Sequence, residues 1–177
     1  KPFFMRAGIC APTAQILCLA GAAILAPGCL EWASCHLSWK YPMPILNLSL
    51  SSAPDARQSA AIAATLSRLT AQLLHKAPEL TSVAISHLDA AHWFVGGPSL
   101  QAQGKASFFL DILISDETNT AAEKAAYIAA VFAAMQESLG ALHEVSYIHV
   151  HDARQAAWGY GGLTQQFRAV RKALQQP

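Results

Sequence analysis

The feature that most constrains the fold of this chain is an internal repeat. Trp93 begins a W-x-x-G-G motif, and Trp158 begins the same motif again near the end of the chain. Each motif follows a strand pattern, a helical pattern and a second strand pattern, so the chain holds two copies of one strand–helix–strand unit. Such a unit pairs its strands in parallel through a right-handed crossover. We therefore expect an α+β domain, with a four-stranded mixed sheet and two helices on one face.

The strand patterns set the limits of the two copies. The predicted strands are 45–50 and 80–88 in the first copy, about residues 44–101, and 108–114 and 145–150 in the second, about residues 105–168. The sheet face away from the helices still carries apolar side chains, which need a cover. In a chain this short, we expect a neighbouring subunit to provide that cover.

The helical patterns lie between the strands. In the first copy, Ser52 is the expected N-cap, and apolar residues recur at spacings of four, three and four: Ile62, Leu66, Leu69 and Leu73. In the second copy, Thr120 and Glu123 predict a capping box, and Gly140 predicts the helix end. Its apolar stripe consists of Ile128, Val131, Phe132, Met135 and Leu139.

The segment 1–42 differs from the remainder, 43–177, which we take as one domain. All four cysteines lie in this first segment. Its apolar run over residues 7–30 has three interpretations: a signal peptide starting at Met5, a membrane anchor, or translated upstream sequence outside the native protein. The domain itself has no cysteine and fits a reducing compartment, so we expect a cytoplasmic protein. Export is the alternative if residues 5–29 are a genuine signal.

Charge narrows the function classes. The net charge is +1, and residues 43–177 carry nine Lys and Arg against ten Asp and Glu. This balance excludes the basic surface with which nucleic-acid-binding proteins displace counterions. His149 and His151 alternate on one predicted strand, but the sequence places no third ligand beside them, so we predict no metal site.

Several segments together resemble the tautomerase superfamily. Met43-Pro44 at a strand start, with residues 92–97, resembles 4-oxalocrotonate tautomerase, and residues 147–152 resemble the Tyr-Ile-Asn strand of macrophage migration inhibitory factor (MIF). The double-length chain is similar to the fused members of this superfamily. The resemblance implies an isomerase that needs no cofactor, assembled as a homotrimer with active sites between neighbouring subunits.

The resemblance also implies that Pro44 is the general base. A free N-terminal proline is a secondary amine, and an apolar pocket near cations lowers its pKa toward neutrality. It can then move a proton alpha to a carbonyl. Within a peptide bond the nitrogen is an amide, so this role requires cleavage just before Pro44. The alternative is that Pro44 merely opens an edge strand. The second copy begins with Phe108, which implies one site per subunit.

Five further residues are site candidates, each with a structural alternative. Tyr147 and His149 share a strand face and fall where the resemblance implies that a neighbour lends a Tyr and an Asn. Tyr147 could donate to an enolate and His149 could move a proton, or both could line an interface. Lys76 and Lys105 could bind a substrate carboxylate or be solvated cations. Trp93 could form an aromatic wall or pack a hairpin.

The arginines that bind diacids in the superfamily are replaced in this chain. Pro54 and Ala84 occupy their places, and Arg57 falls inside the first helix. We therefore predict keto–enol tautomerisation of a small 2-oxo or enol monoacid. The alternatives are a hydratase, dehalogenase or decarboxylase of the same superfamily, and a non-catalytic MIF-like binding trimer.

Overall fold

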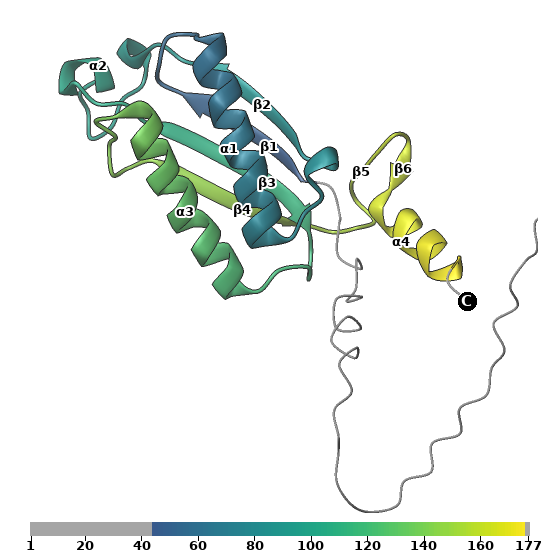
Figure 1. Ribbon diagram of the computed structural model, residues 1–177. Helices are drawn as coiled ribbons and strands as arrows, with labels where there is room; N and C mark the ends of the chain where they lie inside the picture. Colours follow the sequence, from purple (N-terminus) through teal and green to yellow (C-terminus); the bar gives the residue numbers. More distant parts are fainter. Residues whose placement is uncertain (1–43, 176–177) are drawn as a thin grey trace, which may run out of the picture. The chain divides into compact units, whose positions relative to one another are not determined.

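A four-stranded sheet with two long helices on one face forms the core (Figure 1). The computed structural model describes residues 44–175, so the interpretations of residues 1–42 lie outside the described part of the chain. The strands are β1 (Ile45–Leu50), β2 (Ser82–His87), β3 (Phe108–Ser115) and β4 (Tyr147–Ala153). Their spatial order is β2-β1-β3-β4. The pairs β1–β2 and β3–β4 are parallel and β1–β3 is antiparallel, which confirms the predicted mixed sheet.

The two long helices are equivalent in length and position. Helices α1 (Ala56–Leu74) and α3 (Ala121–Leu139) have 19 residues each and lie on the same face of the sheet. When the repeats are aligned on their Trp residues, three buried positions coincide: Ile62, Leu66 and Thr70 in α1, and Tyr127, Val131 and Met135 in α3. The strands meet these helices with alternate, fully buried side chains: Leu46, Leu48 and Leu50, and Leu110, Ile112 and Ile114. The core is thus built twice from one pattern.

The start of α1 corrects the sequence prediction. Its N-cap is Asp55 rather than Ser52, because the Asp55 carboxylate accepts a hydrogen bond from the Arg57 N–H at 2.8 Å. Pro54 disfavours helical backbone at the residue before it, so a helix cannot easily begin there. The predicted capping box of α3 is confirmed, with Thr120 and Glu123 bonding reciprocally.

A buried polar pair between the helices also departs from the prediction. Ile128, predicted for the apolar stripe of α3, is 39% exposed, and Tyr127 is fully buried in its place. The Tyr127 hydroxyl lies 3.1 Å from Thr70 Oγ1 on α1. Burial raises the pKa of Tyr127 to about 12. The phenol therefore stays neutral, and its hydrogen bond satisfies both hydroxyls in the core.

Both W-x-x-G-G motifs form a turn that leads into a helix. In each, the first helical N–H donates to the Trp carbonyl: Leu100 to Trp93 at 2.8 Å, and Gln165 to Trp158 at 3.0 Å. The second motif also forms a small hairpin. The elements around these motifs are η2 (Pro78–Leu80), η3 (Ala90–His92), α2 (Leu100–Gln103), β5 (Gly159–Tyr160), β6 (Leu163–Thr164) and α4 (Gln165–Leu174). Within residues 44–175, no helix is long and apolar enough to cross a bilayer.

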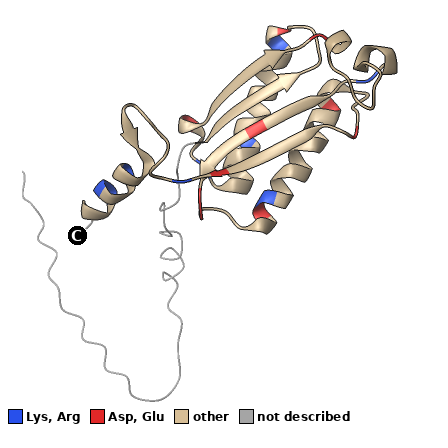
Figure 2. Ribbon diagram, turned by 180° about the vertical axis from the view of Figure 1, so that it is seen from behind, with Lys and Arg blue, Asp and Glu red and all other residues tan. Residues whose placement is uncertain are grey.

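The sheet face opposite the helices is uncovered in the single chain and nearly uncharged (Figure 2). We call it the open face. Asp111 is the one Asp, Glu, Lys or Arg that the four strands place on it, since Asp152 alternates to the helix side. Its large apolar and aromatic side chains include Ile45, Phe109 and Tyr147, exposed by 37%, 40% and 62%. Such a surface suits contact with another protein subunit.

Candidate active site

Pro44 lies at one end of the sheet, directly before β1. Its ring is buried, and its carbonyl accepts a hydrogen bond from the Ser82 N–H at 3.2 Å. Ile45 pairs with Leu113, so this end is also where β3 and β4 terminate. We call it the Pro44 end. Because β1 lies between β2 and β3, the alternative that Pro44 opens an edge strand is wrong.

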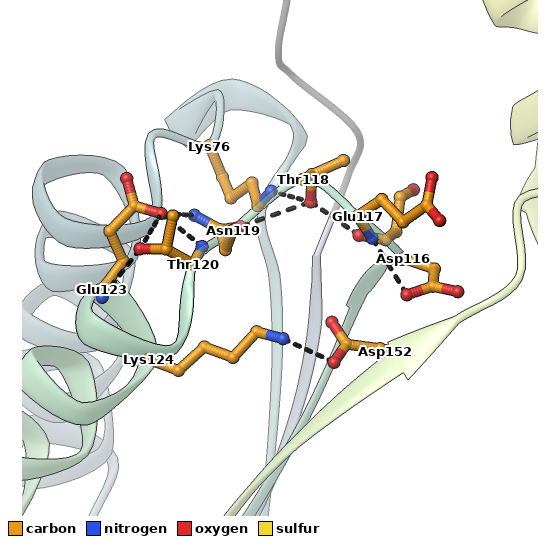
Figure 3. A network of polar contacts seen from close by, with 10 residues as sticks. Lys76, Asp116, Glu117, Thr118, Asn119, Thr120, Glu123, Lys124 and Asp152 are labelled. Atoms are coloured by element: carbon orange, nitrogen blue, oxygen red, sulfur yellow. Dashed lines mark hydrogen bonds and ion pairs between the residues drawn. The ribbon is translucent and has the colours of Figure 1, made fainter.

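Lys76 lies at the Pro44 end and is buried, with 1% of its surface exposed. Its ammonium group donates to Thr118 Oγ1 at 2.8 Å, and Thr118 in turn donates to the Ser115 carbonyl at 2.6 Å (Figure 3). The alternative of a solvated cation therefore does not fit Lys76. Shielding an ammonium group from water is costly unless it is bonded or serves a function.

The loop that carries Thr118 is held by a polar network (Figure 3). Glu123 accepts hydrogen bonds from the Thr120 N–H at 2.7 Å and from the Asn119 amide at 3.3 Å. The Thr120 N–H is the main reason that the pKa of Glu123 lies below its usual value. Lys124 pairs with Asp152 at the end of β4. These contacts fix the loop beside Lys76.

Lys105 and Trp93 lie at the other end of the sheet. Lys105 follows α2 and precedes β3, and Trp93 directly follows η3. Strand β2 ends at His87 and β3 begins at Phe108, and both residues pair with Leu50, the last residue of β1. A single chain therefore separates these two residues from Pro44 by the length of β1. A shared site would require a second subunit.

Tyr147 and His149 lie together on the open face, as their spacing predicts, but on the edge strand β4. Strand β3 separates them from β1, so one chain does not bring them to Pro44. His149 Nδ1 lies 2.8 Å from Asp111 Oδ1 on β3. The His151 ring lies edge-on to His149, with the ring centroids 5.4 Å apart. Within residues 44–175, no three His, Cys, Asp or Glu side chains cluster closely enough to hold a metal ion.

Sequence reasoning missed two polar residues near these candidates. Asp111 is a single charged residue within an apolar strand, and no sequence motif marks it as a site residue. Its alternation with Phe109 does place the two side chains on the same face of the sheet. Arg154 follows β4 at the Pro44 end. It lines a hollow of about 370 Å³ together with Asp116, Glu117, Gln155, Ala156 and Gln166. Another hollow, of about 320 Å³, lies far from Pro44 beside His87 and Pro54.

Comparison with known proteins identifies the fold through structure and not through sequence. No protein-family model matches the chain, and no curated protein sequence matches it. The solved structures that resemble it include a fused 4-OT symmetric trimer, Pt0534 inactivated by 2-oxo-3-pentynoate, and MIF2 of Leishmania major. Sequence identities are 21%, 17% and 16%, and TM-scores are 0.60, 0.60 and 0.59. The matches cover 69%, 75% and 71% of this chain and 96%, 99% and 98% of theirs. The fold of fused 4-OT and MIF structures, expected from the resemblance, is confirmed.

Proposed function

We propose that this protein is a cofactor-independent isomerase, a keto–enol tautomerase of a small 2-oxo or enol acid. Pro44 is the general base in every chain that begins at Pro44. The observation that carries this proposal is the pairing of a buried proline before β1 with a buried ammonium group, Lys76, at the same end of the sheet. The fold shared with fused 4-OT adds support.

The chemistry needs only these two groups and a hydrogen-bond donor. The secondary amine of Pro44 takes a proton from one position of the enol acid and returns it to another, so atoms and charge balance over the cycle. The Lys76 ammonium group binds the carboxylate or the carbonyl oxygen. Since Lys76 is shielded from water, its charge acts on a developing enolate more strongly than an exposed cation does.

We propose a homotrimer whose subunits complete one another's sites. The fused 4-OT structure is a symmetric trimer, and the open face of this chain has the low charge of an interface. A neighbour covering this face would bring its β4 edge, with Tyr147 and His149, toward Pro44. Tyr147 then donates to the enolate oxygen, and His149 moves a proton. Trp93 or Lys105 joins this site only from another subunit.

The substrate that fits best is a monoacid. Ala84 is exposed on β2, where the tautomerase resemblance implies an arginine. Among the described residues, Lys76 is the buried cation at the Pro44 end. A hydratase, dehalogenase or decarboxylase would use the same proline with a different substrate. A non-catalytic MIF-like binding trimer would keep the fold alone. We propose the cytoplasm as the location, since the domain has no cysteine.

The first experiment asks where the natural chain begins. The intact mass of the protein purified from its own cells is expected to match a chain starting at Pro44. A mature chain that retains residues ahead of Pro44 would rule out the amine and with it the catalytic proposal. Sedimentation of the same sample should give a trimer. A monomer would contradict the shared site.

The second experiment measures catalysis by the chain that starts at Pro44. Ketonisation of phenylenolpyruvate should fall by about 100-fold or more in Pro44→Ala, the scale of losing a general base. Pro54→Ala is the matched control, because Pro54 is exposed at the other end of β1. The electrophilic alkyne 2-oxo-3-pentynoate, which inactivates Pt0534, should add its mass to the Pro44 peptide. Unchanged turnover in Pro44→Ala would remove Pro44 as base, and wild-type inactivity on every enol acid would favour a binding protein.

A further inference from the structure

We propose that Asp111 is a positioning residue that fixes the ring orientation and tautomer of His149. The juxtaposition that carries this inference is a solvent-shielded carboxylate oxygen facing one imidazole nitrogen across the β3–β4 pair. The catalytic consequence rests on the proposed function, in which His149 serves a neighbour's Pro44 site. The effect of Asp111 on the imidazole itself does not depend on that function.

The geometry identifies which atoms meet. Asp111 and His149 are register partners on adjacent parallel strands, and Asp111 Oδ1 lies 2.8 Å from His149 Nδ1. Oδ1 is shielded from solvent, and no other described residue donates a hydrogen bond to it. The two atoms are within hydrogen-bond distance, although the contact does not meet the angular criteria of a hydrogen bond, so it is a close electrostatic pair. Nδ1 is thus the ring nitrogen that holds its hydrogen toward Asp111.

The other ring nitrogen is available to a ligand. The His149 side chain is 57% exposed, and no group within residues 44–175 bonds to its Nε2. With Nδ1 protonated toward Asp111, a neutral His149 presents an unprotonated Nε2, and a protonated His149 presents Nε2–H. His149 can therefore accept and return a proton at one atom. This is the role that an orienting carboxylate gives to a functional histidine.

The position of Asp111 supplies a second argument. It is the one charged side chain that the four strands place on the open face, with apolar neighbours along β3 and Asn47 as its register partner on β1. A carboxylate covered by another subunit is costly unless it is paired. His149 is the basic side chain in contact with it, and the His151 ring lies edge-on to the His149 ring. The pair therefore remains compatible with a covered face.

The first repeat shows what this position looks like without the pair. The offset between the repeats is 64 residues at their first strands and 65 at the Trp motifs, so Asn47 is equivalent to Asp111, and Ala84 is equivalent to His149. Asn47 and Ala84 are register partners in the same way, yet Ala84 offers no polar atom to Asn47. The carboxylate and the imidazole thus occur together only in the second repeat. Asn47 also provides a matched control on the same face.

The test reads the imidazole directly and the reaction separately. Nitrogen-15 NMR of the wild-type protein, recorded where the imidazoles are neutral, should give the Nδ1–H tautomer for His149. Asp111→Ala should shift His149 toward the Nε2–H tautomer, and Asn47→Ala should not. In phenylenolpyruvate turnover, Asp111→Ala should lower kcat by about 10- to 100-fold with little change in KM, the range found when an orienting partner of a functional histidine is removed. In a His149→Asn background the same change should lower kcat no further.

The outcomes separate this inference from the proposed function. An Asp111→Ala protein that folds, keeps the wild-type tautomer and keeps kcat would overturn the inference, while loss of activity in Pro44→Ala would still support the tautomerase. An inactive wild-type protein whose tautomer nonetheless depends on Asp111 would overturn the proposed function and support the positioning role. Asp111→Asn, which is closer in size, serves if Asp111→Ala does not fold. An equal loss of kcat in the presence and absence of His149 would also overturn the inference.

Discussion

The two repeats of this chain share their apolar framework and differ at their polar positions. Their long helices have equal lengths, and the buried stripe of one recurs at equivalent positions in the other. At equivalent positions, however, the residues differ. The first repeat begins with Pro44 and the second with Phe108, and the open face carries Asn47 in the first repeat and Asp111 in the second. The apolar positions thus specify the fold in both copies, whereas the candidate functional residues occupy positions at which the two copies differ.

The closing helices show the same contrast at larger scale. Both begin with an N–H bonded to the Trp of the W-x-x-G-G motif. Helix α2 stops after four residues at Gly104, with Leu100 fully buried. Helix α4 continues for ten residues and exposes Phe167, Val170 and Leu174. One helix start therefore serves as an internal connection in the first repeat and as an exposed amphipathic helix in the second.

The largest predicted difference between the repeats lies at their first residues. Phe108 is fully buried and packs against Phe132, with ring centroids 6.3 Å apart. Phe108→Ala should lower the free energy of unfolding by about 3–5 kcal/mol, because it leaves a cavity in the core. Pro44→Ala should change stability by less than about 1 kcal/mol. Urea unfolding of both variants measures the difference, and equal losses would show that the two positions are structurally equivalent after all.

A smaller effect is expected at the polar pair that joins the helices. Tyr127→Phe should cost about 1–3 kcal/mol, because Thr70 Oγ1 is left buried without its partner. Thr70→Val should cost a similar amount, and the double variant should cost less than the sum. Thermal unfolding of the three proteins gives this cycle. Strict additivity would mean that the hydroxyls do not interact.

The helix N-termini should differ by less. Thr120→Ala removes a full capping box and should cost about 1–2 kcal/mol, whereas Asp55→Ala removes a single cap bond and should cost about 0.5–1 kcal/mol. Chemical denaturation compares the two variants. A larger loss for Asp55→Ala would mean that the caps do not differ as their hydrogen bonds suggest.

The smallest predicted effect depends on pH. The Thr120 N–H, the Thr120 and Asn119 side chains and His75 hold the pKa of Glu123 below its usual 4.5. The ionised Glu123 therefore stabilises the fold above pH 4.5, and this contribution is lost as the pH falls through the lowered pKa. The stability gap between wild type and Glu123→Gln should be present at about pH 7 and shrink as the pH falls below 4.5. Gln58, at the equivalent place in α1, is uncharged, so Gln58→Ala should show no such dependence.

Periodicity and turn chemistry were enough to predict the sheet, both helices and the capping box, since these depend on local patterns. The cap lies at Asp55 and not at the expected Ser52, because Pro54 disfavours helical backbone at the residue before it. Tyr127 and Thr70 carry hydroxyl groups, so a pattern of purely apolar residues does not include them. Ile62 is the equivalent of Tyr127 in the first repeat, so the repeat itself indicates a core position at Tyr127. Asp111 was not selected because a cross-strand contact depends on register.

Buried Lys76 could not be distinguished from a surface lysine by sequence. Its burial follows from the loop at Thr118, which reaches it from a distant part of the chain. The separation of Lys105 and Trp93 from Pro44 within one chain likewise follows from strand direction. The sequence predicts the direction of each strand, but only the complete topology shows that these residues lie at opposite ends of the sheet. Residues that a resemblance groups in one site can thus lie at opposite ends of one subunit.

The central β1–β3 pair has a consequence for how the chain folds. Ile45 pairs with Leu113, so the seam between the two copies runs through the middle of the sheet and joins residues far apart in sequence. Each copy can form its parallel pair and helix from nearer contacts, but the shared core exists only after the halves dock. The architecture is therefore that of a tethered dimer. The linker around Gly104 keeps the two copies at a high effective concentration, whereas two separate copies would have to meet by diffusion.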